Sequence, residues 1–159
     1  MTARTGMQNP KNFIFDVELQ LKDAGLVASS AAAQVASSAK VIDFSADVPT
    51  DADIPEFYGN LVVDVTAVEI ASNDELYTIV MQGSDVNDFT TGSPEIIELG
   101  VLRLGANEVL AGNLDSTVGR YVIPVTNERN GTRYRYIRLF TVVAGTIATG
   151  INFSAYLAK

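Results

Sequence analysis

Residues 135–143 have the sequence RYIRLFTVV, and the alternation of side-chain types in this stretch predicts a β-strand. From Ile137 onward, its odd positions are aliphatic apart from one threonine: Ile137, Leu139, Thr141 and Val143. Its even positions place a cation among aromatic side chains: Tyr136, Arg138 and Phe140. Because an arginine buried without a partner costs several kcal/mol, we expect the odd positions to face a core and the even positions to face outward.

Alternating or β-branched runs recur along the whole chain, with Gly, Asn, Asp and Pro between them. They lie at residues 13–21, 41–44, 61–70, 76–82, 96–104, 119–126, 133–143 and 151–157. About eight short strands at such intervals are typical of an antiparallel sandwich or jelly roll. The predicted fold is therefore all-β, an antiparallel β-sandwich of jelly-roll type with about eight strands.

Three connections between these runs carry more specific expectations. The polar spacer at residues 71–75 predicts a β-hairpin between the runs on either side of it. The dipeptide formed by Asn130 and Gly131 predicts a tight turn. Residues 22–40 are mostly Ala, Ser and Gly, which indicates either a short helix around residues 29–35 or an extended loop. The loop is favoured, because Ser and Gly dilute the alanines.

The length of 159 residues suits one domain. Residues 13–159 are predicted to form a single β-sandwich domain, and the polar residues 1–12, which have no periodicity, to form a flexible N-terminal arm. The arm has no apolar run of the kind that a secretory signal needs. No stretch of the sequence is apolar over the length that a membrane-spanning helix requires, so we expect no membrane partner.

The residue types that the sequence lacks exclude several kinds of catalytic and metal-binding site. It has no Cys, His or Trp, which removes cysteine nucleophiles, thiolate zinc sites and histidine general bases. Nineteen acidic and eleven basic residues give a net charge of −8, which opposes binding to phosphate backbones. Only 19% of residues are charged and 47% are hydrophobic, which indicates a surface partly covered by another molecule. We therefore expect no enzyme activity, no cofactor and no nucleic-acid partner.

Acidic residues gather in two predicted loops: Asp47, Asp51, Asp53 and Glu56 in the first, and Asp85 and Asp88 in the second. Their spacing does not match a calcium-binding loop, so we interpret them as solvated carboxylates and expect no metal site. Pairs of carboxylates can also serve a glycosidase. Sugar sites usually add tryptophan platforms, and this chain has none.

Charge is distributed unevenly along the chain. All nineteen carboxylates lie at or before Glu128, and five basic residues with no acidic residue follow it. Two interpretations stay open. The basic strand pairs with acidic strands of the same domain, or part of it faces an acidic neighbouring chain.

Three stretches of the sequence resemble a known family. The first is LQLKDAG at residues 19–25, which runs through Ala and Ser repeats to VIDF at residues 41–44. The second covers residues 61–66 and 77–89 and ends in GSDVNDF. The third is RYIRL at residues 135–139, followed by TVVAGT, a glycine turn and a final run at residues 151–157. Together they resemble the capsid cement (decoration) proteins of tailed bacteriophages, of the jelly-roll type on the head of a Bordetella phage.

This resemblance implies a structural virion protein that binds the outer surface of an assembled capsid and bridges neighbouring capsomers. The implied partners are the major capsid protein and the chain itself, as a homodimer or homotrimer, and the implied location is the outside of the virion after synthesis in the host bacterial cytoplasm. The alternative is a carbohydrate- or receptor-binding jelly-roll module of a phage tail or fibre. The predicted interface consists of Tyr136, Arg138 and Phe140 on the outer face of their strand, with Lys11 and Asn12 of the arm.

Overall fold

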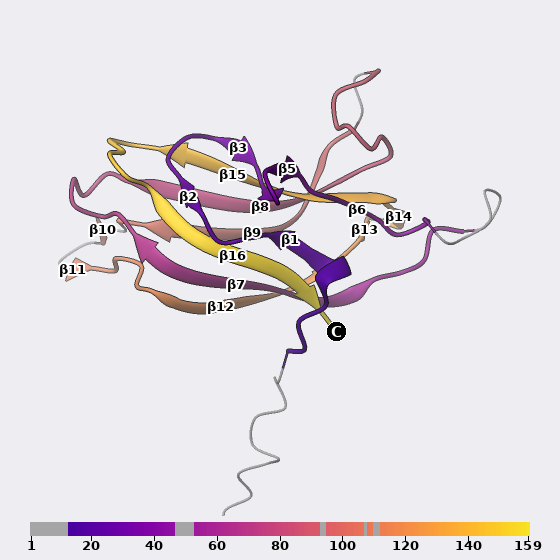
Figure 1. Ribbon diagram of the computed structural model, residues 1–159, viewed down its shortest axis with the longest axis horizontal. Coiled ribbons are helices and arrows are strands. Elements are labelled where there is room, and N and C mark those ends of the chain that lie inside the picture. The colour runs from indigo at the N-terminus through magenta and orange to yellow at the C-terminus, as the bar shows by residue number, and fades with distance from the viewer. Residues whose placement is uncertain (1–12, 47–52, 93–94, 107, 110–111) are drawn as a thin grey trace, which may run out of the picture.

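Two antiparallel sheets lie face to face in the computed structural model, which describes residues 13–46, 53–92, 95–106, 108–109 and 112–159 (Figure 1). The first sheet has the order β1 (Gln20–Lys22), β16 (Ile151–Ala158), β7 (Tyr58–Val68) and β12 (Gly119–Thr126), and β2 (Leu26–Val27) also pairs with β16. In the second sheet, β15 (Tyr136–Ala144) lies between β8 (Leu76–Ser84) and an edge made of β3 (Ala31–Ala32) and β6 (Val41–Asp43), and β9 (Ile97–Gly105) lies beyond β8. Three small sheets pair β4 (Gln34–Val35) with β5 (Ser38–Ala39), β10 (Glu108–Val109) with β11 (Gly112–Asn113), and β13 (Glu128–Arg129) with β14 (Thr132–Arg133).

The strands follow the order of a jelly roll. If β1 and β2 count as one edge strand, and β3 and β6 as another, the principal strands in chain order lie as 1-8-3-6 in the first sheet and 2-7-4-5 in the second. The predicted all-β jelly-roll sandwich is therefore confirmed. The described residues form sixteen separate strands rather than about eight, because two edges are interrupted and three short hairpins are added.

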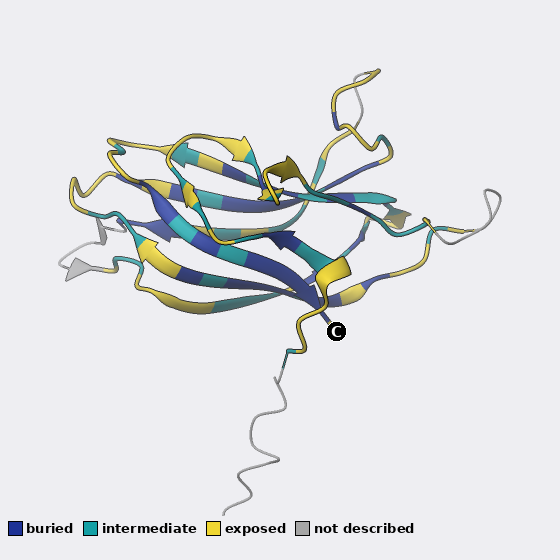
Figure 2. Cartoon of the chain, in the orientation of Figure 1, coloured by how far each residue is buried: buried dark blue, intermediate teal, exposed yellow. Residues whose placement is uncertain are grey.

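The core lies between the two sheets, because alternation sends one row of side chains from each strand inward. Figure 2 shows the buried residues along the strands of both sheets. Fully buried members of this row from the first sheet are Leu61, Val63 and Phe153, and from the second sheet Ile79, Ile137 and Leu139. Burial of each such side chain contributes about 1.5–3 kcal/mol. The outer faces of the two sheets are consequently the surfaces left for partners.

The clearest alternation in the sequence, residues 13–21, does not form one strand, so that prediction is wrong. Only the end of this run enters β1, and Val17–Leu19 forms the 3-10 helix η1. Gln20 lies opposite Tyr156 on β16, and β16 ends at Ala158. In this antiparallel register Glu18 would lie opposite Ala158, so residues before Glu18 run past the end of the strand with which they would pair.

The predicted hairpin across residues 71–75 is also wrong. β7 belongs to the first sheet and β8 to the second, so this spacer crosses from one layer to the other. The crossing folds around Glu75, which is fully buried and whose carboxylate accepts hydrogen bonds from the amides of Ser72 at 2.6 Å and Asp74 at 3.1 Å. A short polar spacer suits a hairpin and this crossing equally well.

Residues 22–40, predicted as a loop or a short helix, contain the short strands β2 to β5 instead. Their small side chains let the backbone lie against the sheet edges, as where the Ala33 amide donates to the Leu139 carbonyl at 2.9 Å. The tight turn at Asn130 and Gly131 is confirmed, because both residues have positive φ, 53° and 79°, between β13 and β14. Within the described part of the chain, no helix is long and apolar enough to cross a membrane.

Candidate partner-binding surface

Strand β15 divides its side chains between the core and the outer face of the second sheet. Ile137, Leu139 and Thr141 are at most 1% exposed and point into the sandwich. Tyr136 and Phe140 are half-buried on the opposite side. The register predicted for this strand is therefore correct.

Arg138 lies on this outer face between two aromatic rings. Its guanidinium carbon is 4.2 Å from the centroid of the Phe89 ring and 5.2 Å from that of Phe140. Its Nε donates to Gln82 Oε1 at 2.8 Å, across the β8–β15 pair. Burial lowers the pKa of the Arg138 guanidinium from its ordinary value, because the half-buried charge has lost part of its hydration.

The loop after β8 holds Phe89 in this position. Phe89 is only 3% exposed, although its backbone has φ of 59°, a conformation that aromatic residues rarely adopt. The Asp88 carboxylate accepts hydrogen bonds from the amides of Thr90 and Thr91, both at 2.8 Å, and from the Thr91 hydroxyl. These bonds, the Thr91 hydroxyl first, lower the pKa of Asp88 to about 2. Asp88 is thus a local cap that fixes the loop carrying Phe89.

An apolar strip borders Arg138 on the same face. We define it as Leu76, Val80, Val101, Phe140 and Val142, which lie on β8, β9 and β15. Val80 sits between Phe140 and Val101 in the ladder and is 2% exposed. Leu76, Val142 and Val101 keep 46%, 44% and 38% of their surfaces exposed. The strip and the half-buried cation together resemble the composition of interface centres.

The other arginines of β12 and the C-terminal region mostly have carboxylate partners. Arg120 pairs with Asp64 at 2.6 Å, Arg133 with Glu128 at 3.1 Å, and Arg135 with Asp43 at 2.8 Å: three ion pairs within the domain. Arg133 and Arg135 therefore follow the first interpretation of the charge asymmetry, pairing inside one domain. Arg138 forms no ion pair with any described residue.

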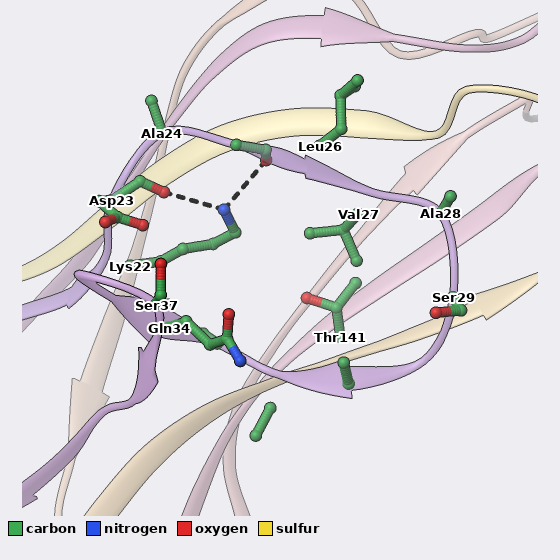
Figure 3. Close-up of a pocket in the computed structure, with 14 residues that line it drawn as sticks. Lys22, Asp23, Ala24, Leu26, Val27, Ala28, Ser29, Gln34, Ser37 and Thr141 are labelled. Carbon is green, nitrogen blue, oxygen red and sulfur yellow. Dashed lines mark hydrogen bonds between the residues drawn. The ribbon is translucent and has the colours of Figure 1, made fainter.

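A cavity of about 380 Å³ lies under the loop that follows β1 (Figure 3). Lys22 is 6% exposed there, its Nζ donates to the carbonyl oxygens of Asp23 at 2.9 Å and Gly25 at 3.0 Å, and it lies 4.8 Å from the Phe153 ring centroid. Burial lowers the pKa of the Lys22 ammonium, and the nearby Asp23 carboxylate opposes this with a smaller rise. These contacts hold the loop after β1 against β16, so the role of Lys22 is structural.

The acidic residues form no cluster suited to a metal within the part of the chain that the structure describes. Asp53 is exposed, and Glu56 lies 3.6 Å from Arg133. Asp47 and Asp51 of the first acidic loop lie outside the described residues.

The structure brings together the three predicted interface residues of β15, but other residues of the same chain already contact two of them. Tyr136 stacks on Arg135 at 4.9 Å, and Phe89 covers Arg138. On this outer face, the more exposed apolar side chains therefore lie further along the sheet, at Leu76, Val101 and Val142, which sequence reasoning missed. Lys11 and Asn12, with the rest of the predicted arm, lie outside the described residues.

Comparison of the chain with protein-family models and with curated proteins found no match.

Proposed function

We propose that this chain is a structural protein that binds the outer surface of a tailed-bacteriophage capsid and cements neighbouring capsomers. The family resemblance of the sequence suggests the partner, and one structural observation supports the surface. Arg138 is held between Phe89 and Phe140, without a carboxylate among the described residues, beside the exposed apolar strip.

Such an arginine is prepared for a partner's carboxylate. Its ring contacts and the Gln82 bond fix the side chain before binding, so little rotamer freedom remains to be lost. Nε donates to Gln82, whereas the terminal amino groups form no hydrogen bond with a described residue and make up the side of the guanidinium that suits a carboxylate. An aspartate or glutamate of the shell protein would complete the pair, and the apolar strip would exclude water around it.

Binding to the assembled shell explains how the protein would stabilise a capsid. A ligand that binds only the assembled state shifts the equilibrium toward assembly in proportion to its occupancy. Symmetric shells also favour symmetric ligands, which suits the proposed homodimer or homotrimer. The carbohydrate-binding alternative gains no support from the cavity near Lys22, whose lining has no aromatic side chain.

The test is co-sedimentation of the purified chain with capsids of the phage that encodes it, stripped of this protein. We expect Arg138→Glu to weaken binding at least about tenfold, because it sets two carboxylates against each other in a half-buried site. Lys159→Glu makes the same charge change at an exposed residue that follows β16 of the first sheet and should bind like the wild type. Failure of the wild-type chain to bind, or equal binding by the two variants, would show that the proposal is wrong.

A further inference from the structure

Residues 13–17, with the sequence FIFDV, alternate like a strand but have no strand partner in the described chain. They leave the sandwich where β16 ends (Figure 1). Among the described hydrogen bonds, the backbone of this segment takes part only in turns at its C-terminal end, where the Asp16 carbonyl accepts from the Leu19 amide at 3.0 Å and the Val17 carbonyl accepts from the Gln20 amide. The Asp16 carboxylate also accepts from the Glu18 amide at 3.0 Å. The backbone groups of Phe13, Ile14 and Phe15 form no hydrogen bond with described residues, so they are open to a second strand.

The side chains of this segment are partly anchored and partly exposed. Phe13 packs against the small outer cluster of Val62, Tyr156 and Ala158 on the first sheet, and Phe15 meets the Tyr156 ring edge-on, with the ring centroids 5.3 Å apart. The rest of the apolar surface is uncovered: Ile14 is 82% exposed, Val17 62% and Phe15 53%. An apolar segment held at this position with so much free surface is typical of an interaction site.

The segment is complementary to itself in one antiparallel register. If Phe15 lies opposite Phe15 of a second copy, Phe13 lies opposite Val17 and Ile14 lies opposite Asp16. One face of the pair then holds only aromatic and aliphatic side chains, which are favourable cross-strand neighbours. The two Asp16 carboxylates do not oppose each other in this register, so it avoids the repulsion of directly opposed like charges.

We propose that residues 13–17 of two copies pair as antiparallel strands around a two-fold axis at Phe15, with Val17 leaving the first position of η1 to join the strand, and that this pairing forms the homodimer. A two-fold axis makes the contact isologous, so the pairing closes after two copies and does not propagate into a filament. The inference deepens the self-association included in the proposed function. It needs no capsid, so its failure is separate from failure of capsid binding through Arg138.

Mass measurement in solution, as protein concentration is raised toward the millimolar range, tests the pairing. We expect a dimer whose dissociation constant rises at least about tenfold in Phe15→Ser, since each dimer loses two rings. The substitution Val118→Ser, at a residue 60% exposed elsewhere on the molecule, is the matched control and should leave the dimer intact. Circular dichroism establishes that both variants fold.

Cross-linking tests the register, because the native chain contains no cysteine. Directly opposed strand residues have Cα atoms about 5 Å apart, within disulfide range, so Phe15→Cys should form a disulfide-linked dimer on mild oxidation. In the same register the two copies of residue 18 lie about 20 Å apart, so Glu18→Cys should not cross-link. A monomer at all concentrations, a dimer unaffected by Phe15→Ser, or equal cross-linking at both positions would overturn the inference.

Discussion

Replacement of Phe89 separates the contribution of its ring from that of its backbone conformation. The ring is 3% exposed and lies on Arg138, and the backbone has φ of 59°. Removing a buried phenylalanine ring costs about 1.5–3 kcal/mol by transfer alone, and the lost cation–π contact adds about 0.5–1 kcal/mol. We therefore expect Phe89→Ala to lower the free energy of unfolding by about 3 kcal/mol.

Phe89→Gly loses the same ring but should be less destabilising than Phe89→Ala. Glycine adopts positive φ without the penalty of about 1–2 kcal/mol that an L-side chain incurs there. We expect Phe89→Gly to cost about 2 kcal/mol, which inverts the usual order of alanine and glycine at a fixed site. Urea unfolding followed by far-UV circular dichroism measures both variants.

Asn73 provides the control for this pair, because it has the same φ of 59° and is exposed. Asn73→Gly should be more stable than Asn73→Ala by about 1 kcal/mol in the free energy of unfolding, since only the backbone conformation distinguishes the two variants there. If both Phe89 variants lost less than about 0.5 kcal/mol, the magnitude of an ordinary surface substitution, the ring would not lie packed on Arg138. If Phe89→Gly proved the worse of the two, the positive φ would be refuted.

Two further predictions concern polar groups that position the loops. Asn127 is fully buried; its side-chain oxygen accepts from the Phe57 amide at 2.8 Å, and its side-chain nitrogen donates to the Pro55 carbonyl at 2.9 Å. In urea unfolding, Asn127→Ala should lower the free energy of unfolding by about 2–4 kcal/mol, whereas Asn87→Ala, at an exposed residue, should change it little. Hydrogen bonds to Glu69 from the amides of residues 148–150, that of residue 150 first, lower its pKa below 4.5. The ionised Glu69 carboxylate therefore stabilises the fold above pH 4.5, and this stabilisation is lost as the pH falls through the folded-state pKa. The difference in melting temperature between the wild type and Glu69→Gln should consequently shrink on acidification. A difference that stayed constant with pH would contradict this.

Sequence patterns predicted the part of the candidate surface that a single strand determines. One arginine among aliphatic residues was enough to orient β15, because only one face could bury without leaving an unpaired charge. The same logic could not orient β8, which contains no charged residue and has apolar side chains on both faces, Ile79 on one and Val80 on the other. The sequence alone therefore did not predict that Leu76, Val101 and Val142, the exposed members of the apolar strip, share one face.

The rest of the surface depends on contacts between distant segments. Phe89 stands in a polar loop, and nothing in its spacing indicates that it lies on Arg138 of another strand. Residues 13–21 failed for a related reason. Alternation predicts that a segment can form a strand, but strand formation also needs a partner, and β16 ends too early to supply one.

The proposed capsid binding is tested most directly by a cryo-electron microscopy map of phage heads incubated with this chain, which would show whether it binds and which face of the sandwich meets the shell. We expect the outer face of the second sheet to lie against the shell protein, with Leu76 and Val142 covered and a carboxylate of the shell within hydrogen-bond distance of Arg138. A map in which this face points to solvent, with Arg138 still covered only by Phe89 and Phe140 of its own chain, would contradict the proposed mode of attachment.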